Sequence, residues 1–199
     1  MVLCHEKKCI FIHIPKTGGT SIEQFIKDNG KNNLLFLGVK NGRSLHHLRG
    51  HELKLIIPYI YKKYFKFSII RNPYDRLLSE YYWTPIVNLG YKYGKSKKHF
   101  LENVSEIVKN KKYFENINND HFIPQYSFLY NKNKLLVDQL FKYEDLDWVS
   151  KYLKKKLNIS REFPYLNKTS IKKEEWNEEE KKIIYDLYQI DFLYFGYQK

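Results

Sequence analysis

The sequence is poor in cysteine and has no long apolar run. Cys4 and Cys9 are the two cysteines among 199 residues, and they lie too near each other to staple a fold, which excludes a disulfide scaffold. No apolar run approaches the length of a membrane span, and residues 1–8 lack the apolar segment of a signal peptide. We therefore expect a soluble chain of a reducing compartment, the cytoplasm, with no membrane partner.

Acidic residues are also few relative to basic ones. The 35 Lys and Arg residues outnumber the 22 Asp and Glu residues, so the formal net charge is +13. Such a surface attracts polyanions, for example nucleic acid, acidic lipid or sulfated glycans. However, an A/T-rich genome would produce the same abundance of Lys, together with the many Asn, Ile and Tyr residues found here. Charge alone therefore does not decide the function.

Neither an internal repeat nor a second domain is visible in the sequence. A chain of 199 residues with 43% hydrophobic residues can bury one sizeable core, so we expect a single domain over residues 1–199. Short apolar segments alternate with helical patterns, which predicts an α/β fold with a central, mostly parallel sheet flanked by helices. The expected strands are residues 9–14, 34–39, 65–70 and 135–142.

The most informative stretch follows the first expected strand. Pro15 ends that strand, and Gly18 and Gly19 can adopt backbone conformations closed to other residues. Residues 20–23 have the form of a capping box that starts a helix. The free N–H groups of such a loop and helix start suit an anion. One lysine and three hydroxyl groups add further donors: Lys16, Thr17, Thr20 and Ser21. We interpret the stretch as a phosphate-binding loop; a tight turn whose glycines only permit packing is the alternative.

A second junction of the same kind follows the third expected strand, residues 65–70. Arg71 stands at the carboxyl end of this strand, where open α/β sheets place their ligands. Asn72 is a suitable helix N-cap and Pro73 a suitable first helical residue. Arg76 and Ser79 would then lie one turn apart on one helix face. An alternative role for Arg76 is a structural ion pair with Glu80 or with a loop carboxylate.

The two stretches together resemble a known family. The order Pro-Lys-Thr-Gly-Gly-Thr-Ser over residues 15–21 resembles the 5′-phosphosulfate loop of sulfotransferases that use 3′-phosphoadenosine 5′-phosphosulfate (PAPS), especially those acting on carbohydrates. It differs from the Walker motif, in which the Lys follows the last Gly. Residues 71–79 resemble the 3′-phosphate motif of that family. The resemblance implies a P-loop-like domain that binds PAPS and releases PAP, adenosine 3′,5′-bisphosphate. The implied cofactor-binding residues are Lys16, Thr17, Gly18, Gly19, Thr20, Ser21, Arg71 and Ser79.

Three histidines lie between these motifs, in a segment expected to be one helix over residues 45–57. His47 and His51 would share a helix face, and His46 is adjacent. A zinc site is conceivable, but no carboxylate or cysteine nearby in the sequence completes a ligand set, so we expect no metal. The residues alone also fit a solvated helix face. The resemblance implies a histidine general base, which we assign to His47 with His51 as second candidate, and we expect His46 to contact the substrate.

Two further residues are implied by the resemblance alone. Gln125 lies in a Pro-Gln segment similar to one near the active site of the family, so it is a candidate for acceptor contact. Residues 167–169, Asn-Lys-Thr, resemble a loop that closes over the cofactor, and Lys168 could reach a phosphate.

The expected reaction is transfer of a sulfuryl group from PAPS to a hydroxyl acceptor, which we expect to be a glycan, by in-line displacement. Lys16 would stabilise the charge of the leaving phosphate, and a histidine of near-neutral pKa would take the hydroxyl proton. A small P-loop kinase is an alternative, weakened by the position of the Lys and by the lack of a clear Asp for Mg²⁺. A basic nucleic-acid-binding module with stacking Tyr residues is another, although no RNA-binding signature is present. A protein of this family that binds nucleotide without catalysis is a third.

Overall fold

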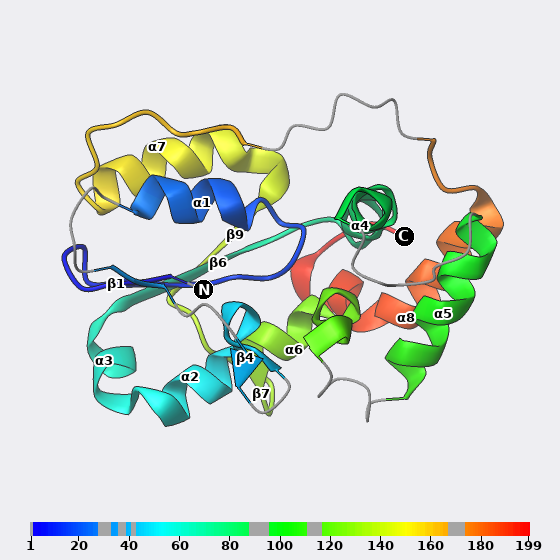
Figure 1. The fold of residues 1–199 in the computed structure, drawn as a ribbon, viewed down its shortest axis with the longest axis horizontal. Helices are drawn as coiled ribbons and strands as arrows, with labels where there is room; N and C mark the ends of the chain where they lie inside the picture. Colours follow the sequence, from blue (N-terminus) through cyan, green and yellow to red (C-terminus); the bar gives the residue numbers. More distant parts are fainter. Residues whose placement is uncertain are drawn as a thin grey trace.

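A five-stranded sheet with helices on both faces forms the centre of the molecule (Figure 1). The computed structural model describes residues 2–27, 33–35, 39–40, 43–87, 96–110, 117–166 and 174–199. The strand order is β3-β1-β2-β6-β9. These strands are β1 (Val2–Cys4), β2 (Cys9–Ile12), β3 (Asn33–Leu35), β6 (Phe65–Ile70) and β9 (Gln139–Lys142).

The sheet is mostly parallel, because β2, β6 and β9 run in one direction and β1 alone is reversed. The β2–β6 and β6–β9 pairs are parallel, whereas β1 pairs antiparallel with both β2 and β3. The expected α/β fold with a mostly parallel sheet is therefore confirmed. Strand β1 was not predicted, because three apolar residues are too short to give a periodic signal. It forms a hairpin with β2 through a turn in which Lys8 has a positive φ of 47°.

The side chains of β2 alternate between two hydrophobic cores. Cys9 and Phe11 pack into the core beneath α1 (Gly19–Ile26) and α7 (Leu146–Lys156). Ile10 and Ile12 point to the opposite core, as the two-residue period of a strand requires. Three helices cover that second face: α2 (Gly50–Ile56), α3 (Pro58–Lys63) and α6 (Gln125–Leu129). The buried sheet fixes the carboxyl ends of its strands, from which both motifs leave.

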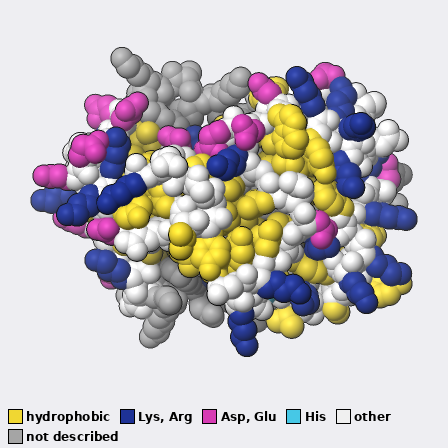
Figure 2. Space-filling view, turned by 180° about the vertical axis from the view of Figure 1, so that it is seen from behind, with side chains coloured by type: hydrophobic (Ala, Val, Ile, Leu, Met, Phe, Trp, Pro, Cys, Tyr) yellow, Lys and Arg dark blue, Asp and Glu magenta, His cyan; other side chains and the backbone are white. Residues whose placement is uncertain are grey.

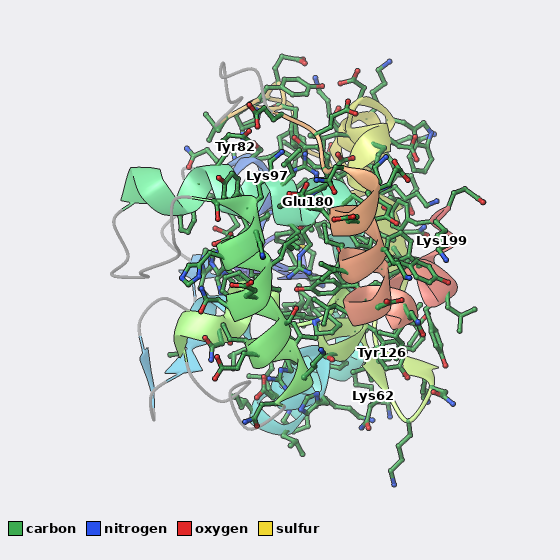
Figure 3. The ribbon with its side chains drawn as sticks, turned by 90° about the vertical axis from the view of Figure 1, so that its right-hand side faces the viewer. Lys62, Tyr82, Lys97, Tyr126, Glu180 and Lys199 are labelled. Atoms are coloured by element: carbon green, nitrogen blue, oxygen red, sulfur yellow. The ribbon has the colours of Figure 1, made fainter. Side chains whose placement is uncertain are left out.

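A third core joins three helices at one end of the sheet. These helices are α4 (Pro73–Val87), α5 (Lys97–Lys109) and α8 (Glu178–Phe195). Figure 3 shows α5 and α8 side by side, with Lys97 and Glu180 at their first turns. The start of α4 is as predicted, because the Asn72 side chain accepts a hydrogen bond from the Tyr74 N–H at 2.9 Å. This cap places Arg76 and Ser79 on α4.

The predicted capping box over residues 20–23 is wrong. Helix α1 begins at Gly19, and its N-cap is Gly18, whose φ of 79° is left-handed. Thr20 therefore lies inside the first turn. Glu23 instead contacts two imidazoles, those of His13 and His46. A buried contact with two rings has replaced the local cap that the sequence pattern favoured.

The predicted helix over residues 45–57 is also interrupted. Residues Leu45–His47 form a 3₁₀ helix, η1, and α2 starts only at Gly50, where the Arg49 N–H donates to the Glu52 carboxylate at 2.8 Å. His47 and His51 consequently do not share a helix face. As expected, the segment ends at Pro58, which opens α3.

Two predicted strands are divided. The segment 34–39 separates into β3 and β4 (Val39–Lys40), and β4 pairs with β5 (Arg43–Ser44) in a small sheet; residues 36–38 lie outside the described residues. The segment 135–142 contributes to β8 (Lys134–Leu135), which pairs with β7 (Tyr130–Asn131), and then to β9. Two 3₁₀ helices, η3 (Ile117–Phe122) and η4 (Tyr143–Asp145), complete the described elements.

The surface mixes basic and acidic side chains. Figure 2 shows one face, on which Lys and Arg side chains are scattered and interspersed with acidic ones around a band of hydrophobic side chains. Among the described residues, no helix is both long and apolar enough to cross a membrane.

Candidate functional site

The two motifs meet at the carboxyl ends of neighbouring strands. Strands β2 and β6 are parallel partners, so the glycine loop (residues 15–21) and Arg71 leave the sheet at the same edge. The Arg71 guanidinium donates through one terminal nitrogen to the carbonyl of Lys16 at 3.2 Å, and it lies 4.3 Å from the centre of the Tyr143 ring. Its Nε is buried without a hydrogen-bond partner among the described residues. One donor of Arg71 therefore remains for a ligand.

The glycine loop is tightly wound. Lys16 and Gly18 both have positive φ values, 66° and 79°. The Thr17 hydroxyl donates to the Ile14 carbonyl at 2.9 Å and is fully buried, so it closes the turn instead of facing a ligand. Both glycines are also required by close packing. A Cβ at Gly18 would lie 2.8 Å from the Tyr143 ring, and a Cβ at Gly19 would lie 2.0 Å from Nε2 of His13.

The remaining donors of the loop have different surroundings. The Lys16 ammonium stands over the Trp83 ring, 4.3 Å from its centre. Ser21 is buried, and its hydroxyl oxygen accepts from the Leu166 N–H at 3.1 Å, whereas Thr20 is exposed. Leu166 leads directly into residues 167–173, so Lys168 lies outside the described residues. Close packing accounts for both glycines, as it would in a simple tight turn. It does not account for Lys16, which is held at the end of β2 beside Arg71.

Arg76 anchors the glycine loop from α4. Its buried guanidinium donates to the carbonyls of Pro15 at 3.2 Å, His121 at 2.8 Å and Ile123 at 2.9 Å. Arg76 therefore ties the loop to the segment that follows η3. Ser79 lies one turn further along α4 and is half-buried.

Gln125 holds the main chain of Arg71. Its amide oxygen accepts from the Arg71 N–H at 2.9 Å, and its amide nitrogen donates to the Arg71 carbonyl at 2.9 Å. Gln125 is fully buried, and the Asp191 carboxylate accepts from its backbone N–H at 2.9 Å. The side chain expected to contact an acceptor is thus engaged with the main chain of Arg71, and its contact with an acceptor stays a prediction.

Histidines from separate segments gather beside the glycine loop. The His47 ring lies 5.2 Å from the rings of both His13 and His121 and 4.9 Å from that of His46, between ring centres. The expectation that no carboxylate accompanies the histidines is wrong. Glu23 lies 2.9 Å from Nδ1 of His13 and 2.6 Å from Nε2 of His46.

His47 lies at the centre of this cluster. Its Nδ1 is 3.7 Å from the buried Asp120 carboxylate, beyond hydrogen-bond range, and is buried without a hydrogen-bond partner among the described residues. His121 contacts Glu80 at 2.7 Å and stacks on Trp83, with 5.1 Å between the ring centres. Through Trp83, which also contacts Lys16, the cluster is continuous with the glycine loop.

Burial lowers the pKa of two of these imidazoles, those of His13 and His47. It lowers the pKa of His13 to about 4, although Glu23 acts in the opposite direction. Burial, and after it the neighbouring histidines, hold the pKa of His47 well below its ordinary value. The pKa of the Glu23 carboxyl is lowered by its contacts with His13 and His46, which outweigh its burial. Neutral imidazoles beside a carboxylate can accept a proton or bind a cation.

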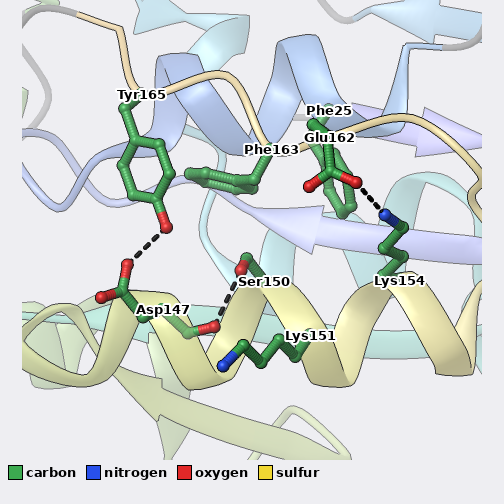
Figure 4. A pocket seen from close by; sticks show the side chains of 8 residues that line it. All are labelled: Phe25, Asp147, Ser150, Lys151, Lys154, Glu162, Phe163 and Tyr165. Carbon is green, nitrogen blue, oxygen red and sulfur yellow. Dashed lines mark hydrogen bonds and ion pairs between the residues drawn. The ribbon is translucent and has the colours of Figure 1, made fainter.

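A separate pocket lies between α1 and α7. Its volume is about 540 Å³, and it is bounded by α7 and by residues 162–165, which cross above it (Figure 4). Lys154 pairs with Glu162 across it, and Tyr165 donates to Asp147. It shares no lining residue with the glycine loop or the histidine cluster, so the chemistry of the site lies elsewhere.

The fold and both junctions agree with a match to a known family. A model of the sulfotransferase family matches residues 1–198. This chain belongs to the sulfotransferase family. Comparison with curated proteins and with solved structures returned no significant match. Membership of this family makes the chain a sulfuryl transferase, and the implied substrate is a hydroxyl acceptor. The match favours neither of the two alternatives, a kinase or a nucleic-acid-binding module.

The candidate site also contains residues that the sequence patterns did not indicate. Lys16, Arg71, His46 and His47 are brought to one region, whereas His51 lies in the first turn of α2, beyond the break that follows η1. The missed residues are His13, Glu23, Trp83, Asp120 and His121. The signal for His13 was its place between a buried strand and the glycine loop. The local pattern of Glu23 indicated a capping box instead, and no local pattern indicated a site role for Trp83, Asp120 or His121.

Proposed function

We propose that this sulfotransferase moves the sulfuryl group of PAPS to a hydroxyl of a carbohydrate. The supporting observation is the meeting of the two motifs: the Arg71 guanidinium contacts the Lys16 carbonyl at 3.2 Å while its Nε remains available. Two cationic side chains at one sheet edge suit a ligand with two phosphate groups. In this proposal Lys16, the N–H groups of the glycine loop, Thr20 and Ser21 hold the 5′ end, and Arg71 and Ser79 hold the 3′-phosphate.

The chemistry proposed is an in-line displacement at sulfur. The acceptor oxygen forms a bond to sulfur as the bond between sulfur and the 5′-phosphate oxygen breaks, so negative charge grows on the leaving PAP. In this proposal Lys16 and the N–H groups at the start of α1 stabilise that charge. Holding donor and acceptor in line contributes several further kcal/mol, on the order of 7–11 in favourable cases.

His47 is the proposed general base, taking the proton that the acceptor hydroxyl loses. It is neutral at neutral pH because burial lowers its pKa, and its Nδ1 has no competing hydrogen bond among the described residues. Asp120, at 3.7 Å, would stabilise the imidazolium that forms. His46, whose side chain is 27% exposed, is the proposed contact to the acceptor. His51 is the second candidate for the base.

Calorimetry with PAP tests the nucleotide site. We expect the wild-type chain to bind PAP, and Lys16→Ala and Arg71→Ala each to remove most of that binding. Lys155→Ala, which removes an exposed lysine at the end of α7, is the matched control and should bind normally. A chain that ignores PAP and binds ATP would refute the proposal.

Labelled PAPS with a panel of glycans, peptides and phenols tests the acceptor and the base. We expect turnover with a glycan, and we expect His47→Ala to bind PAP as the wild type does but to lose turnover. Turnover of a phenol or a peptide in place of every glycan would refute the carbohydrate part. Normal PAP binding without turnover of any acceptor would indicate a nucleotide-binding protein without catalysis.

A further inference from the structure

Three histidine nitrogens converge beside the glycine loop. His13, which follows β2, and His46 and His47 of η1 each offer a ring nitrogen, and these atoms all lie within 4.8 Å of one another. The three residues, called the histidine triad below, come from two segments that the fold brings together. Imidazole nitrogens in this number and proximity are typical ligands of zinc.

The contacts within the site conflict when they are treated as hydrogen bonds. Nδ1 of His13, Nε2 of His46 and Oε1 of Glu23 form a triangle with sides of 2.6, 2.9 and 3.1 Å. A neutral imidazole nitrogen either donates or accepts, and a carboxylate only accepts. If both nitrogens donate to Glu23, two N–H groups face each other at 3.1 Å. If one imidazole donates to the other, a nitrogen lone pair faces the carboxylate.

A single cation removes this conflict. Each of the three atoms can direct a lone pair at one ion, and zinc bonds to nitrogen and to carboxylate oxygen are both about 2.0–2.2 Å long. Tetrahedral ligands at that length stand roughly 3.3 Å apart, so small movements of the side chains suffice. His47 supplies the remaining nitrogen, and the partly exposed His46 provides a route for entry.

The charges also favour a cation. Two carboxylates, Glu23 and Asp120, lie against the histidine triad. Nε2 of His13 faces Gly19 of the glycine loop, whereas the nitrogen that contacts Glu23 and His46 is Nδ1.

We propose that His13, His46 and His47, together with Glu23, bind one divalent transition-metal ion, for which zinc is the best match. Zinc binding itself does not depend on the proposed function, but its expected effect on activity rests on that function. A His47 nitrogen that donates its lone pair to zinc cannot take a proton. Zinc would therefore inhibit sulfuryl transfer while leaving PAP binding intact.

Metal titration of the chelator-treated, full-length chain tests the proposal. Zinc binding is measured by calorimetry, and cobalt(II) is added separately so that its visible absorption reports a tetrahedral nitrogen-rich site. We expect one ion per chain. His46→Ala should weaken zinc binding about 100-fold or more, and Glu23→Gln about 10–100-fold. His99→Ala, which removes an exposed histidine on α5, is the matched control and should leave binding unchanged.

Folding of each variant is checked by circular dichroism, and His46 is chosen because its partly exposed side chain can be removed with little loss of packing. His46→Gln serves as a second variant that keeps a polar side chain. Zinc binding of equal strength in the wild type and both His46 variants, or no binding in the wild type, would overturn the proposal. Zinc binding by a chain that does not bind PAP would support the metal site and refute the proposed function instead.

Discussion

Replacing Gln125 by methionine tests whether this side chain holds Arg71 in place. Gln125 is fully buried and joins α6 to the end of β6 through both ends of its amide. Methionine is similar in length and volume, so it fills the space and leaves little cavity. The substitution therefore removes the hydrogen bonds while largely preserving the packing.

The expected loss follows from two hydrogen bonds of 2.9 Å, after which the Arg71 N–H and carbonyl lack their partner. A buried polar group left unsatisfied costs about 1–3 kcal/mol. Arg71 is only half-buried, and water can reach part of this region, so we expect about 2–4 kcal/mol for the two groups together. A loss near 3 kcal/mol lowers the Tm of a chain of this size by about 6–12 °C.

Urea unfolding measures the free energy of unfolding, and calorimetry measures the affinity for PAP. Because the Arg71 backbone loses its anchor, we also expect PAP affinity to fall about 10–100-fold. Gln139→Met is the control. Gln139 is half-buried on β9, and among the described residues its side chain bonds only to the Leu140 carbonyl, at 3.3 Å, so the substitution should change stability by less than about 0.5 kcal/mol. Unchanged stability and PAP affinity, with a raised KM for the acceptor, would show that Gln125 contacts the acceptor and that the positioning role is wrong.

Three other substitutions give expected outcomes. Arg76→Met should lower the free energy of unfolding by about 3–5 kcal/mol in urea titrations, because three carbonyls including that of Pro15 lose a charged donor; a loss under about 1 kcal/mol would contradict the anchoring role. Gly19→Ala should cost about 1–3 kcal/mol in the same assay, because the new Cβ would lie 2.0 Å from the buried His13 ring, and full stability would contradict this close approach. Burial raises the pKa of Asp191 in the folded state, so this carboxyl stabilises the fold fully below its unfolded pKa of about 4 and less as pH rises through the folded pKa. The stability of the wild type relative to Asp191→Asn should therefore decrease as the pH rises above about 4 in urea titrations, and a pH-independent difference would refute the shift.

The sequence by itself determined the two junctions on which the site is built. Each depends on residues close together in the chain: a short apolar strand, then Pro and Gly residues in one case and Asn72-Pro73 in the other. The Asn72 cap spans only two residues, and local interactions of this kind are readable from a pattern. The buried strand β6 and the position of Arg71 at its end followed from the same local signals.

Only the tertiary structure decided which side chains surround those junctions. Glu23 fits a capping box by local pattern, yet it contacts His46, 23 positions away, because the fold brings η1 beside α1. Gln125 and Arg71 lie 54 positions apart and meet because α6 packs at the end of β6. Such contacts depend on how strands and helices are placed in space, and no periodicity or spacing along the chain encodes that placement.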